Sequence, residues 1–322
     1  MTLMGRDGGN DILIASGPWD PAPWAEAVRA IDPHRATFIW PDLPDSRVIR
    51  YVMAWHPPEA ALQGLPNLKV IFSLGAGVEH ILSRETPPDV PVVRIVSNDL
   101  TKRMTEWVTL QVLMHHRRQR QYDRLQAERR WQELRQPAAS DVRVGVMGMG
   151  VLGRSAAEVL VQLGFRVAGW SRRPKTIAGV ESYHGDAALD PFLARTDILV
   201  ALLPLTPETR GLLSMPLFHK LARDGALGGP VLINAGRGGL QVEADIVRAM
   251  RDGVLIGASL DVFETEPLDR TSPLWGLENV IVTPHCAAWS DPVELTRQIL
   301  DQIAAFESGR PLRNVVDRDA SY

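Results

Sequence analysis

The sequence contains one cysteine, Cys286, among its 322 residues. A single thiol cannot form an intramolecular disulfide, and it cannot supply a cysteine-based zinc site. Long apolar runs are missing too, since none approaches the roughly 18 residues that cross a bilayer. The N-terminal segment lacks a basic start followed by a long apolar core, so we expect no signal peptide. Together these absences predict a cytoplasmic protein.

The chain has no large excess of charge of either sign. It contains 35 Lys and Arg and 38 Asp and Glu, which gives a net charge of −3. That balance gives no reason to expect nucleic acid or an anionic membrane as a partner. Apolar residues make up 45% of the chain and charged residues 23%, which is typical of a globular protein and excludes a disordered or collagen-like chain. The length corresponds to about two domains of ordinary size.

Short apolar runs alternate with segments of helical length along nearly the whole chain. This alternation predicts an α/β fold with parallel sheets. Strands are expected over residues 11–15, 37–40, 48–54, 70–72, 92–95, 142–147, 165–170, 197–202, 231–233, 256–260 and 280–282. Helices are expected over residues 23–31, 101–136, 151–163, 243–252 and 291–307. The strands from residue 142 onward should form a six-stranded sheet, and the last helix should fold back onto the first domain.

The stretch from Thr101 to about Gln136 has helical spacing but changes character halfway. Its first half carries enough apolar residues for a buried helix, whereas its second half is strongly polar. Such a mixed helix is typical of a domain or subunit interface, and a solvated surface helix is the alternative. His115 and His116 are adjacent in sequence and do not have the spacing of a helical metal site, so we expect no metal there.

A glycine-rich turn separates the expected strand at 142–147 from the helix at 151–163. Gly148, Gly150 and Gly153 form the pattern G-x-G-x-x-G, and a second strand follows the helix. In this setting the pattern is typical of dinucleotide binding, because glycines allow a tight turn, close approach of a pyrophosphate and close helix packing. The helix N-terminus adds free N–H groups and the positive end of its dipole. A glycine turn that binds nothing is the alternative.

The end of the following strand carries cations where an NAD-specific site has a carboxylate. Ser171, Arg172 and Arg173 lie there, and no acidic residue occurs between Glu158 and Glu181. A carboxylate would repel a ribose 2′-phosphate, whereas two guanidinium groups and a hydroxyl can bind it through charge-assisted hydrogen bonds. The sequence therefore favours NADP(H) and leaves NAD(H) possible. An ordinary basic surface loop is the alternative.

Three polar residues follow strands in the second half of the chain. Arg237 lies in the motif N-A-G-R-G, Glu266 in D-V-F-E-T-E-P and His285 in T-P-H-C-A-A. Ligands of open α/β sheets bind beyond the carboxyl ends of the strands, so we expect these three loops to converge on one site. Taken one at a time, a surface ion pair or an ordinary loop histidine is the alternative for each residue.

In this order and spacing, the motifs resemble those of the D-isomer-specific 2-hydroxyacid dehydrogenases. The specific matches run from Gly148 to Ala288, and looser similarity covers nearly the whole chain. Within that family the chain most resembles a group that reduces glyoxylate and hydroxypyruvate. The segments that support this closer resemblance are residues 54–58, 73–79, 170–172, 203–209 and 316–322.

The resemblance implies hydride transfer between a nicotinamide cofactor and a small 2-oxo acid. His285 would protonate the substrate carbonyl oxygen, and Glu266 would bond to the imidazole and favour its charged form. Arg237 would hold the substrate carboxylate with its planar guanidinium group. The implied activity is NADPH-dependent reduction of glyoxylate to glycolate and of hydroxypyruvate to D-glycerate.

The resemblance also implies which residues surround the two ligands. The N–H groups of Ala76 and Gly77 would hold the substrate carboxylate, Trp55 would wall the pocket, and Asp261 would approach the nicotinamide carboxamide. The substrate would contact Trp55, Gly75, Ala76, Gly77, Arg237 and His285. The cofactor would contact Gly148, Gly150, Val151, Leu152, Gly153, Ser171, Arg172, Arg173, Leu203, Pro204, Thr209, Ala235, Gly236, Arg237, Asp261, His285 and Ala287.

Two other functions stay open. One is a dehydrogenase for a larger 2-oxo acid, against which the bulk of Trp55 and Trp289 argues. The other is an NAD(P)-sensing binding protein similar to the corepressors that share this fold, against which the intact set of Arg237, Glu266 and His285 argues. Trp289 either shapes the substrate pocket or packs. We expect Cys286 to pack, because adjacent residues of an extended segment point apart.

The family fold implies two α/β domains, Rossmann-like or flavodoxin-like, with parallel sheets and the active site in the cleft between them. Residues 106–290 would form the NAD(P)-binding domain, and residues 1–105 with 291–322 the substrate-binding domain. The cleft would close over both ligands and exclude water. The family also implies a homodimer, with the helix after Thr101 as a candidate contact.

Overall fold

The computed structural model describes residues 11–82, 84 and 88–318. Residues 1–10, on which the expectation about a signal peptide rests, and Tyr322 lie outside these ranges. The described residues form two compact units, which we call the N-terminal unit (11–98 and 290–318) and the central unit (99–289). The divisions fall at 98/99 and 289/290, where we expected 105/106 and 290/291.

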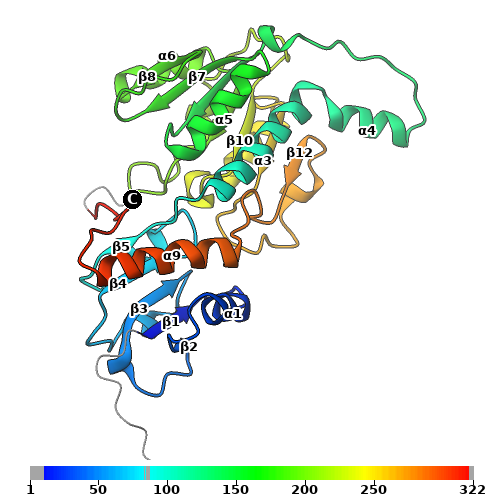
Figure 1. Cartoon of the computed structure of the whole chain (residues 1–322). Helices are drawn as coiled ribbons and strands as arrows, with labels where there is room; N and C mark the ends of the chain where they lie inside the picture. The colour runs from blue at the N-terminus through cyan, green and yellow to red at the C-terminus, as the bar shows by residue number, and fades with distance from the viewer. Residues whose placement is uncertain (1–10, 83, 85–87, 319–322) are drawn as a thin grey trace, which may run out of the picture. The chain divides into compact units, whose positions relative to one another are not determined.

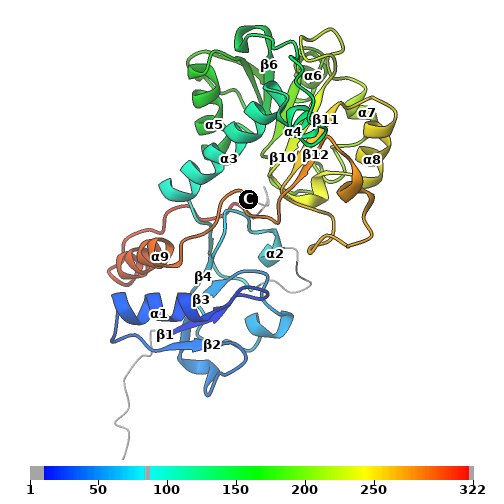
Figure 2. The same cartoon turned by 90° about the vertical axis from the view of Figure 1, so that its right-hand side faces the viewer.

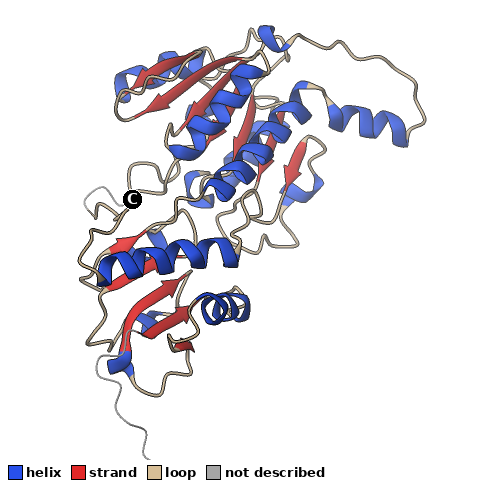
Figure 3. Cartoon of the chain, viewed as in Figure 1, coloured by secondary structure: helices blue, strands red, loops and turns tan. Residues whose placement is uncertain are grey.

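The N-terminal unit is built on a five-stranded sheet in the order β2-β1-β3-β4-β5, with every pair parallel. This order is that of flavodoxin-like doubly wound folds. Figure 3 shows the strands alternating with helices along the chain. The strands are β1 (Asp11–Ala15), β2 (Thr37–Ile39), β3 (Ile49–Ala54), β4 (Val70–Ser73) and β5 (Val92–Val93), and a short helix α2 (Glu79–Leu82) follows β4.

Two helices from opposite ends of the sequence pack against each other in this unit. Both α1 (Ala22–Ile31) and α9 (Pro292–Glu307) lie beside the sheet, as the two views in Figures 1 and 2 show. The Asp291 carboxylate caps α9 by accepting the first free backbone N–H groups of the helix. At the other end, Glu307 accepts a hydrogen bond from Arg35 at 3.0 Å. The C-terminal segment therefore folds back onto the N-terminal unit.

The central unit is built on a parallel sheet in the order β12-β11-β10-β9-β6-β7-β8. Counted from β6, this is the 3-2-1-4-5-6 order of a Rossmann fold with one more strand at the far edge. The strands are β6 (Arg143–Met147), β7 (Arg166–Ser171), β8 (Val180–His184), β9 (Ile198–Ala201), β10 (Val231–Asn234), β11 (Gly257–Leu260) and β12 (Val280–Val282).

The expectation of six strands in this sheet is wrong, because β8 makes a seventh. Its sequence, VESYH, has no apolar run, and its residues are exposed or only half-buried. A strand at a sheet edge has one neighbour and little to bury, so its sequence lacks the apolar pattern by which the other strands were found.

Helices cover both faces of the central sheet. The buried side chains of α3 (Asn98–His116) and α5 (Val151–Gln162) form one core with the sheet. Those of α6 (Leu189–Ala194), α7 (Met215–Phe218) and α8 (Glu243–Arg251) form the other. Figure 2 shows α3 and α5 on one side of the strands, with α7 and α8 on the opposite side. A doubly covered parallel sheet explains why β9, β10 and β11 are buried throughout.

The expectation of one helix up to Gln136 is wrong beyond α3. The chain turns at Arg118, whose φ of 57° lies in the left-handed region, and a separate helix α4 runs over Gln119–Ala127. Residues 128–138 are not helical and carry the fully exposed Trp131, in the long loop after α4 in Figure 1. Helices in proteins are stabilised mainly by packing an apolar face, and within α4 only Leu125 is buried.

Candidate active site

The loops that carry the predicted residues of the central unit leave one edge of its sheet. Because β6, β9, β10, β11 and β12 are parallel, their carboxyl ends meet at that edge. From β6 the chain adds β7 and β8 on one side of the sheet and then continues with β9 on the other side of β6. The strand order therefore reverses between β6 and β9, and open α/β sheets bind their ligands at such a switch point. The glycine turn follows β6 directly.

Each glycine of the turn has a distinct steric role. Gly148 has φ of 99°, and a Cβ there would lie 2.5 Å from the carbonyl oxygen of Leu202. A Cβ on Gly153 would lie 2.0 Å from the carbonyl oxygen of Gly148, so helix and turn pack in contact. A Cβ on Gly150 would meet nothing within 4 Å. The absence of a side chain at Gly150 therefore serves no internal packing and leaves the backbone open to a bound group.

The N-terminus of α5 is open in the same way. Gly150 is the N-cap of the helix and provides no side chain to accept its first N–H groups. Val151 is exposed, and Leu152 is half-buried against the core under α5. Unfilled N–H groups and the positive end of the helix dipole favour a phosphate at this point.

The basic segment after β7 is exposed. Arg172 and Arg173 are both exposed, while Ser171 ends β7 and is half-buried. The Ser171 hydroxyl donates to the Arg173 carbonyl at 2.7 Å, so it would have to rotate to donate to a ligand as expected.

The loop after β9 is closed by a threonine. The Thr209 hydroxyl donates to the Pro204 carbonyl at 2.8 Å and accepts from the backbone N–H of Thr206 at 2.8 Å. The loop then packs on the next one, since a Cβ on Gly236 would lie 2.9 Å from the Leu203 carbonyl oxygen. These contacts bring the two loops after β9 and β10 together.

A buried amide pair holds the backbone of Arg237 in place. The Asn234 side chain donates to the Arg237 carbonyl at 3.2 Å and to Gln241 Oε1 at 2.8 Å, and it accepts from the Gly236 N–H at 3.0 Å. Gln241 in turn donates to the Val262 carbonyl at 2.9 Å. Ala235 is buried beside them. The sequence does not reveal this network, because Asn234 stands out there only as part of the N-A-G-R-G motif and its partner Gln241 lies seven residues away.

His285 and Glu266 form a hydrogen-bonded pair. Nδ1 of His285 lies 2.7 Å from Oε2 of Glu266, and both side chains are about one-third exposed, at 34% and 36%. The other carboxylate oxygen, Oε1, accepts the Phe263 N–H at 3.0 Å. The pair joins the loop after β11 to the loop after β12, which fixes the imidazole ring by its Nδ1 edge.

The surroundings keep Glu266 ionised. Burial is the largest influence and alone would raise the pKa of the Glu266 carboxyl, whereas the hydrogen bond and charge of His285 lower it. The Phe263 N–H and the charge of Arg237 act in the same direction, so the pKa of Glu266 lies below its ordinary value.

Asp261 anchors the segment that carries His285. Its carboxylate, 1% exposed, accepts the Thr283 hydroxyl at 2.6 Å and the N–H groups of Cys286 and Ala287, both at 2.9 Å. The Asp261 carbonyl also accepts the His285 N–H at 2.8 Å, and His285 itself has φ of 52°. Asp261 therefore determines the path of the backbone on both sides of the histidine, a role that the sequence analysis did not foresee.

Cys286 does not pack as expected, because it is exposed. Its backbone N–H donates to the Asp261 carboxylate at 2.9 Å. Partial burial and the negative charge of Asp261 raise the pKa of the Cys286 thiol, which opposes a reactive thiolate. Trp289 is 57% exposed.

The predicted substrate loop lies in the N-terminal unit, directly after β4. Ser73 holds it, with its hydroxyl donating to the Gly77 carbonyl at 2.7 Å and accepting from the Gly75 N–H at 3.3 Å. Ala76 is half-buried. A Cβ on Gly75 would lie 2.2 Å from the ring of Trp55, which is 6% exposed and stacks on Trp19 with 4.6 Å between ring centroids. Trp55 therefore lies against the backbone of the loop.

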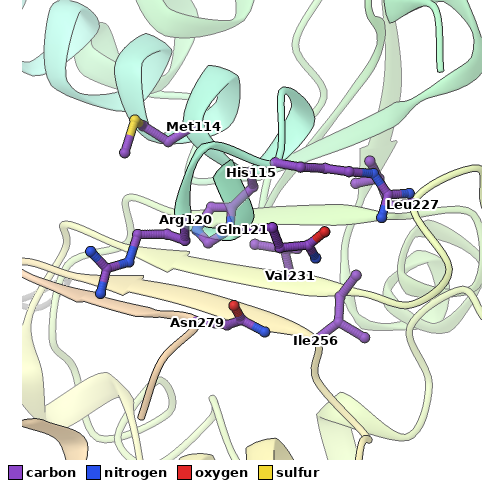
Figure 4. Close-up of a pocket in the computed structure, with 9 residues that line it drawn as sticks. Met114, His115, Arg120, Gln121, Leu227, Val231, Ile256 and Asn279 are labelled. Carbon is purple, nitrogen blue, oxygen red and sulfur yellow. The ribbon is translucent and has the colours of Figure 1, made fainter. Parts of the chain in front are cut away.

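One pocket lies at the opposite, amino-terminal edge of the central sheet. It has a volume of about 40 Å³ and lies between the end of α3 and the strand starts, as Figure 4 shows. His115 lines it, and its Nε2 lies 2.8 Å from the Ser259 hydroxyl; burial lowers the pKa of His115 to about 4. None of the predicted site residues lines this pocket.

Two further features are absent from the part of the chain that the structure describes. No group of three or more His, Cys, Asp or Glu side chains is arranged to hold a metal ion there. None of the helices in that part combines the length and the apolarity needed to span a bilayer.

Comparisons with known proteins give a consistent result. A family model for the D-isomer specific 2-hydroxyacid dehydrogenase, NAD binding domain, matches residues 109–287. The chain is 39% identical over 318 residues to a glyoxylate/hydroxypyruvate reductase A of Escherichia fergusonii, which covers 97% of this chain and 100% of that protein.

Two solved structures are similar over nearly their whole length. One is an NADPH-dependent glyoxylate/hydroxypyruvate reductase from Sinorhizobium meliloti in complex with NADP and sulfate. Its TM-score is 0.93 at 49% identity, with 97% of this chain and 100% of that chain covered. The other is a probable 2-hydroxyacid dehydrogenase from Rhizobium etli in complex with NADP, HEPES and L(+)-tartaric acid. Its TM-score is 0.92 at 50% identity, with 97% and 99% covered.

Asp261→Asn tests the anchoring of the histidine segment. In the variant, the amide oxygen can still accept the Thr283 hydroxyl and the Cys286 N–H, which both donate to Oδ1 of the parent. The amide NH₂ then takes the place of Oδ2 and faces the Ala287 N–H. A buried donor then meets a donor, so we expect the free energy of unfolding in urea to fall by about 2 kcal/mol. Asp269→Asn is the control, because exposed Asp269 uses one oxygen for both of its bonds to Thr271. Equal stability of Asp261→Asn and the parent would contradict the anchoring role.

Proposed function

Because the chain belongs to the D-isomer-specific 2-hydroxyacid dehydrogenase family, we propose that it reduces small 2-oxo acids with NADPH, glyoxylate to glycolate and hydroxypyruvate to D-glycerate. Family membership makes it an NAD(P)-dependent oxidoreductase with two α/β units. The observation that carries the proposal is the His285–Glu266 pair, held 2.7 Å apart at the sheet edge where the glycine turn also lies. A proton donor beside a dinucleotide turn is what hydride transfer to a carbonyl requires.

The central unit would hold the cofactor, which supplies the hydride when bound. The open backbone at Gly150 and the uncapped N-terminus of α5 support a pyrophosphate there, with Gly148, Val151, Leu152 and Gly153 around it. The exposed Arg172 and Arg173 would bind a 2′-phosphate together with Ser171. The remaining contacts would come from Leu203, Pro204, Thr209, Ala235, Gly236, Arg237, Asp261, His285 and Ala287.

His285 would act as the general acid. Its Nδ1 is bonded to Glu266, so the proton that reaches the substrate carbonyl oxygen leaves from Nε2. The lowered pKa of Glu266 keeps a carboxylate, with its negative charge, next to the ring. After transfer the neutral ring remains hydrogen-bonded to the carboxylate and takes up a proton for the next cycle.

The N-terminal unit would bind the other end of the substrate. The N–H groups of Ala76 and Gly77 would hold its carboxylate, with Arg237 from the central unit binding the same group and polarising the carbonyl. The contact of Gly75 with the Trp55 ring supports a wall of fixed shape on one side of that loop. Closure of the two units over both ligands would exclude water from the reacting atoms.

We propose that the functional form is a homodimer in the cytoplasm. The support comes from the surface of the central unit, where α3 exposes Leu110 by 53% and residues 128–138 expose Trp131 fully. Large exposed apolar side chains are enriched at surfaces that contact another protein. A second copy of the chain is the partner that the family relationship favours.

His285→Ala should abolish turnover while NADPH binding is retained. Loss of a general acid lowers rates by about 10² to 10⁴, so kcat for glyoxylate should fall at least 100-fold. In Glu266→Gln, kcat for glyoxylate should fall by a smaller factor, because the His285 ring keeps a hydrogen-bond partner but loses its charged one. Steady-state kinetics and a fluorescence titration with NADPH measure the two effects. Unchanged kcat in His285→Ala would remove this residue from the mechanism.

Replacing both Arg172 and Arg173 by Ala should weaken NADPH binding by about tenfold or more and leave NADH binding within about twofold. The reason is that charge-assisted bonds to a 2′-phosphate are lost, and NADH has no such phosphate. Titration of each variant with both cofactors measures this. Lys175→Ala is the matched control, since Lys175 is another exposed cation of the same segment. Equal weakening of both cofactors would show that the arginines do not recognise the 2′-phosphate.

A further inference from the structure

Arg103 lies near the start of α3 and contacts the first and the last residue of the central unit. Its Nε lies 2.7 Å from Oδ2 of Asp99, and its guanidinium carbon lies 5.6 Å from the centroid of the Trp289 ring. Asp99 is the first residue of the central unit and Trp289 is its last. One arginine therefore touches the two residues next to the only points where the described chain passes from one unit to the other.

The second of these contacts leads to the catalytic segment. Trp289 ends the stretch that starts at His285, and the Asp261 carboxylate accepts the N–H groups of Cys286 and Ala287 between them. Ala287 is buried in the core under α3 and α5. Trp289 itself is 57% exposed and so gains little from burial. Its contact with a cation over the ring face is of a kind that stabilises an exposed aromatic side chain.

The first contact fixes the start of α3. Asp99 lies in the first turn of the helix and Arg103 one turn later, so the ion pair spans residues i and i+4. An exposed ion pair of this kind adds little to stability. Its position matters more, because it fixes the orientation in which the guanidinium group reaches Trp289.

We propose that Arg103 is a positioning residue, which we call the hinge clamp. By contacting both Asp99 and Trp289, it couples the two points where the chain passes between the units, 98/99 and 289/290, so that the units close about one axis. The inference rests on the proposed function, because closure matters only if the loop of Ala76 and Gly77 has to meet Arg237 and His285. If the two connections between the units moved independently, the loop of Ala76 and Gly77 would not reach a defined position relative to Arg237 and His285. A misplacement of reacting groups by about 1 Å lowers rates by up to about 100-fold.

Arg103→Met tests the clamp by removing the charge and keeping a side chain of similar length. We expect kcat/KM for glyoxylate to fall about tenfold, with NADPH affinity within about twofold of the parent, because the cofactor would bind the central unit alone. Arg103→Lys should recover most of the loss, since an ammonium group can also pair with Asp99 and lie over the ring. Arg248→Met is the matched control, because Arg248 pairs with Asp245 one turn earlier on α8 at 2.8 Å.

A double-mutant cycle with Trp289→Leu shows whether Arg103 acts through the ring. If it does, Arg103→Met should cause little further loss in the Trp289→Leu background. Losses that multiply would overturn the clamp and indicate that Trp289 shapes the substrate pocket by itself. So would a fall in NADPH affinity by the same factor as kcat/KM, or a change in kcat/KM of less than twofold.

Hydrogen exchange tests the same proposal without turnover. In the ligand-free protein, Arg103→Met should speed amide exchange severalfold at residues 99–101 and 287–291 and leave the Arg248→Met rates at the parent values. Equal exchange in Arg103→Met and the parent would overturn the clamp. If the parent reduces none of the 2-oxo acids but the exchange result holds, the proposed function fails and the clamp stands.

Discussion

The buried carboxylate of Asp261 is the interaction on which the candidate site depends. It accepts three hydrogen bonds from the segment that follows β12, and its own carbonyl accepts the His285 N–H. A buried carboxylate is costly unless such donors surround it, so the segment and the aspartate determine each other's position. The imidazole is thereby directed at Glu266, and the same segment continues to Trp289 and the second crossing between the units.

The parallel sheet supplies the second constraint. Strands that all run the same way bring the glycine turn, the loop of Arg237, and the loops of Glu266 and His285 to one edge. Contacts between the loops then fix their spacing, with Asn234 and Gln241 holding the arginine backbone and Thr209 closing the neighbouring loop. The chemistry proposed for the site needs these groups to be held rigidly within the central unit.

Much of this could be predicted from the sequence, and what could not has physical reasons. Buried strands were found because their apolar runs are distinctive; β1, for example, has the expected bounds of Asp11–Ala15. β8 was missed because an edge strand buries little, and the helix beyond His116 was extended too far because polar helical spacing does not reveal where packing ends. The Glu266–His285 pair followed from motif order, whereas the anchoring by Asp261 depends on backbone N–H groups that no sequence pattern displays.

The most direct test of the central claim is the oxidation of NADPH and of NADH by the purified protein, followed optically with glyoxylate, hydroxypyruvate, pyruvate and phenylpyruvate. The account predicts rapid oxidation of NADPH with glyoxylate and hydroxypyruvate, and slower reaction with NADH and with the bulkier phenylpyruvate. Absence of turnover with all four acids, in a protein that binds NADPH tightly, would contradict it and favour a protein that only senses the cofactor.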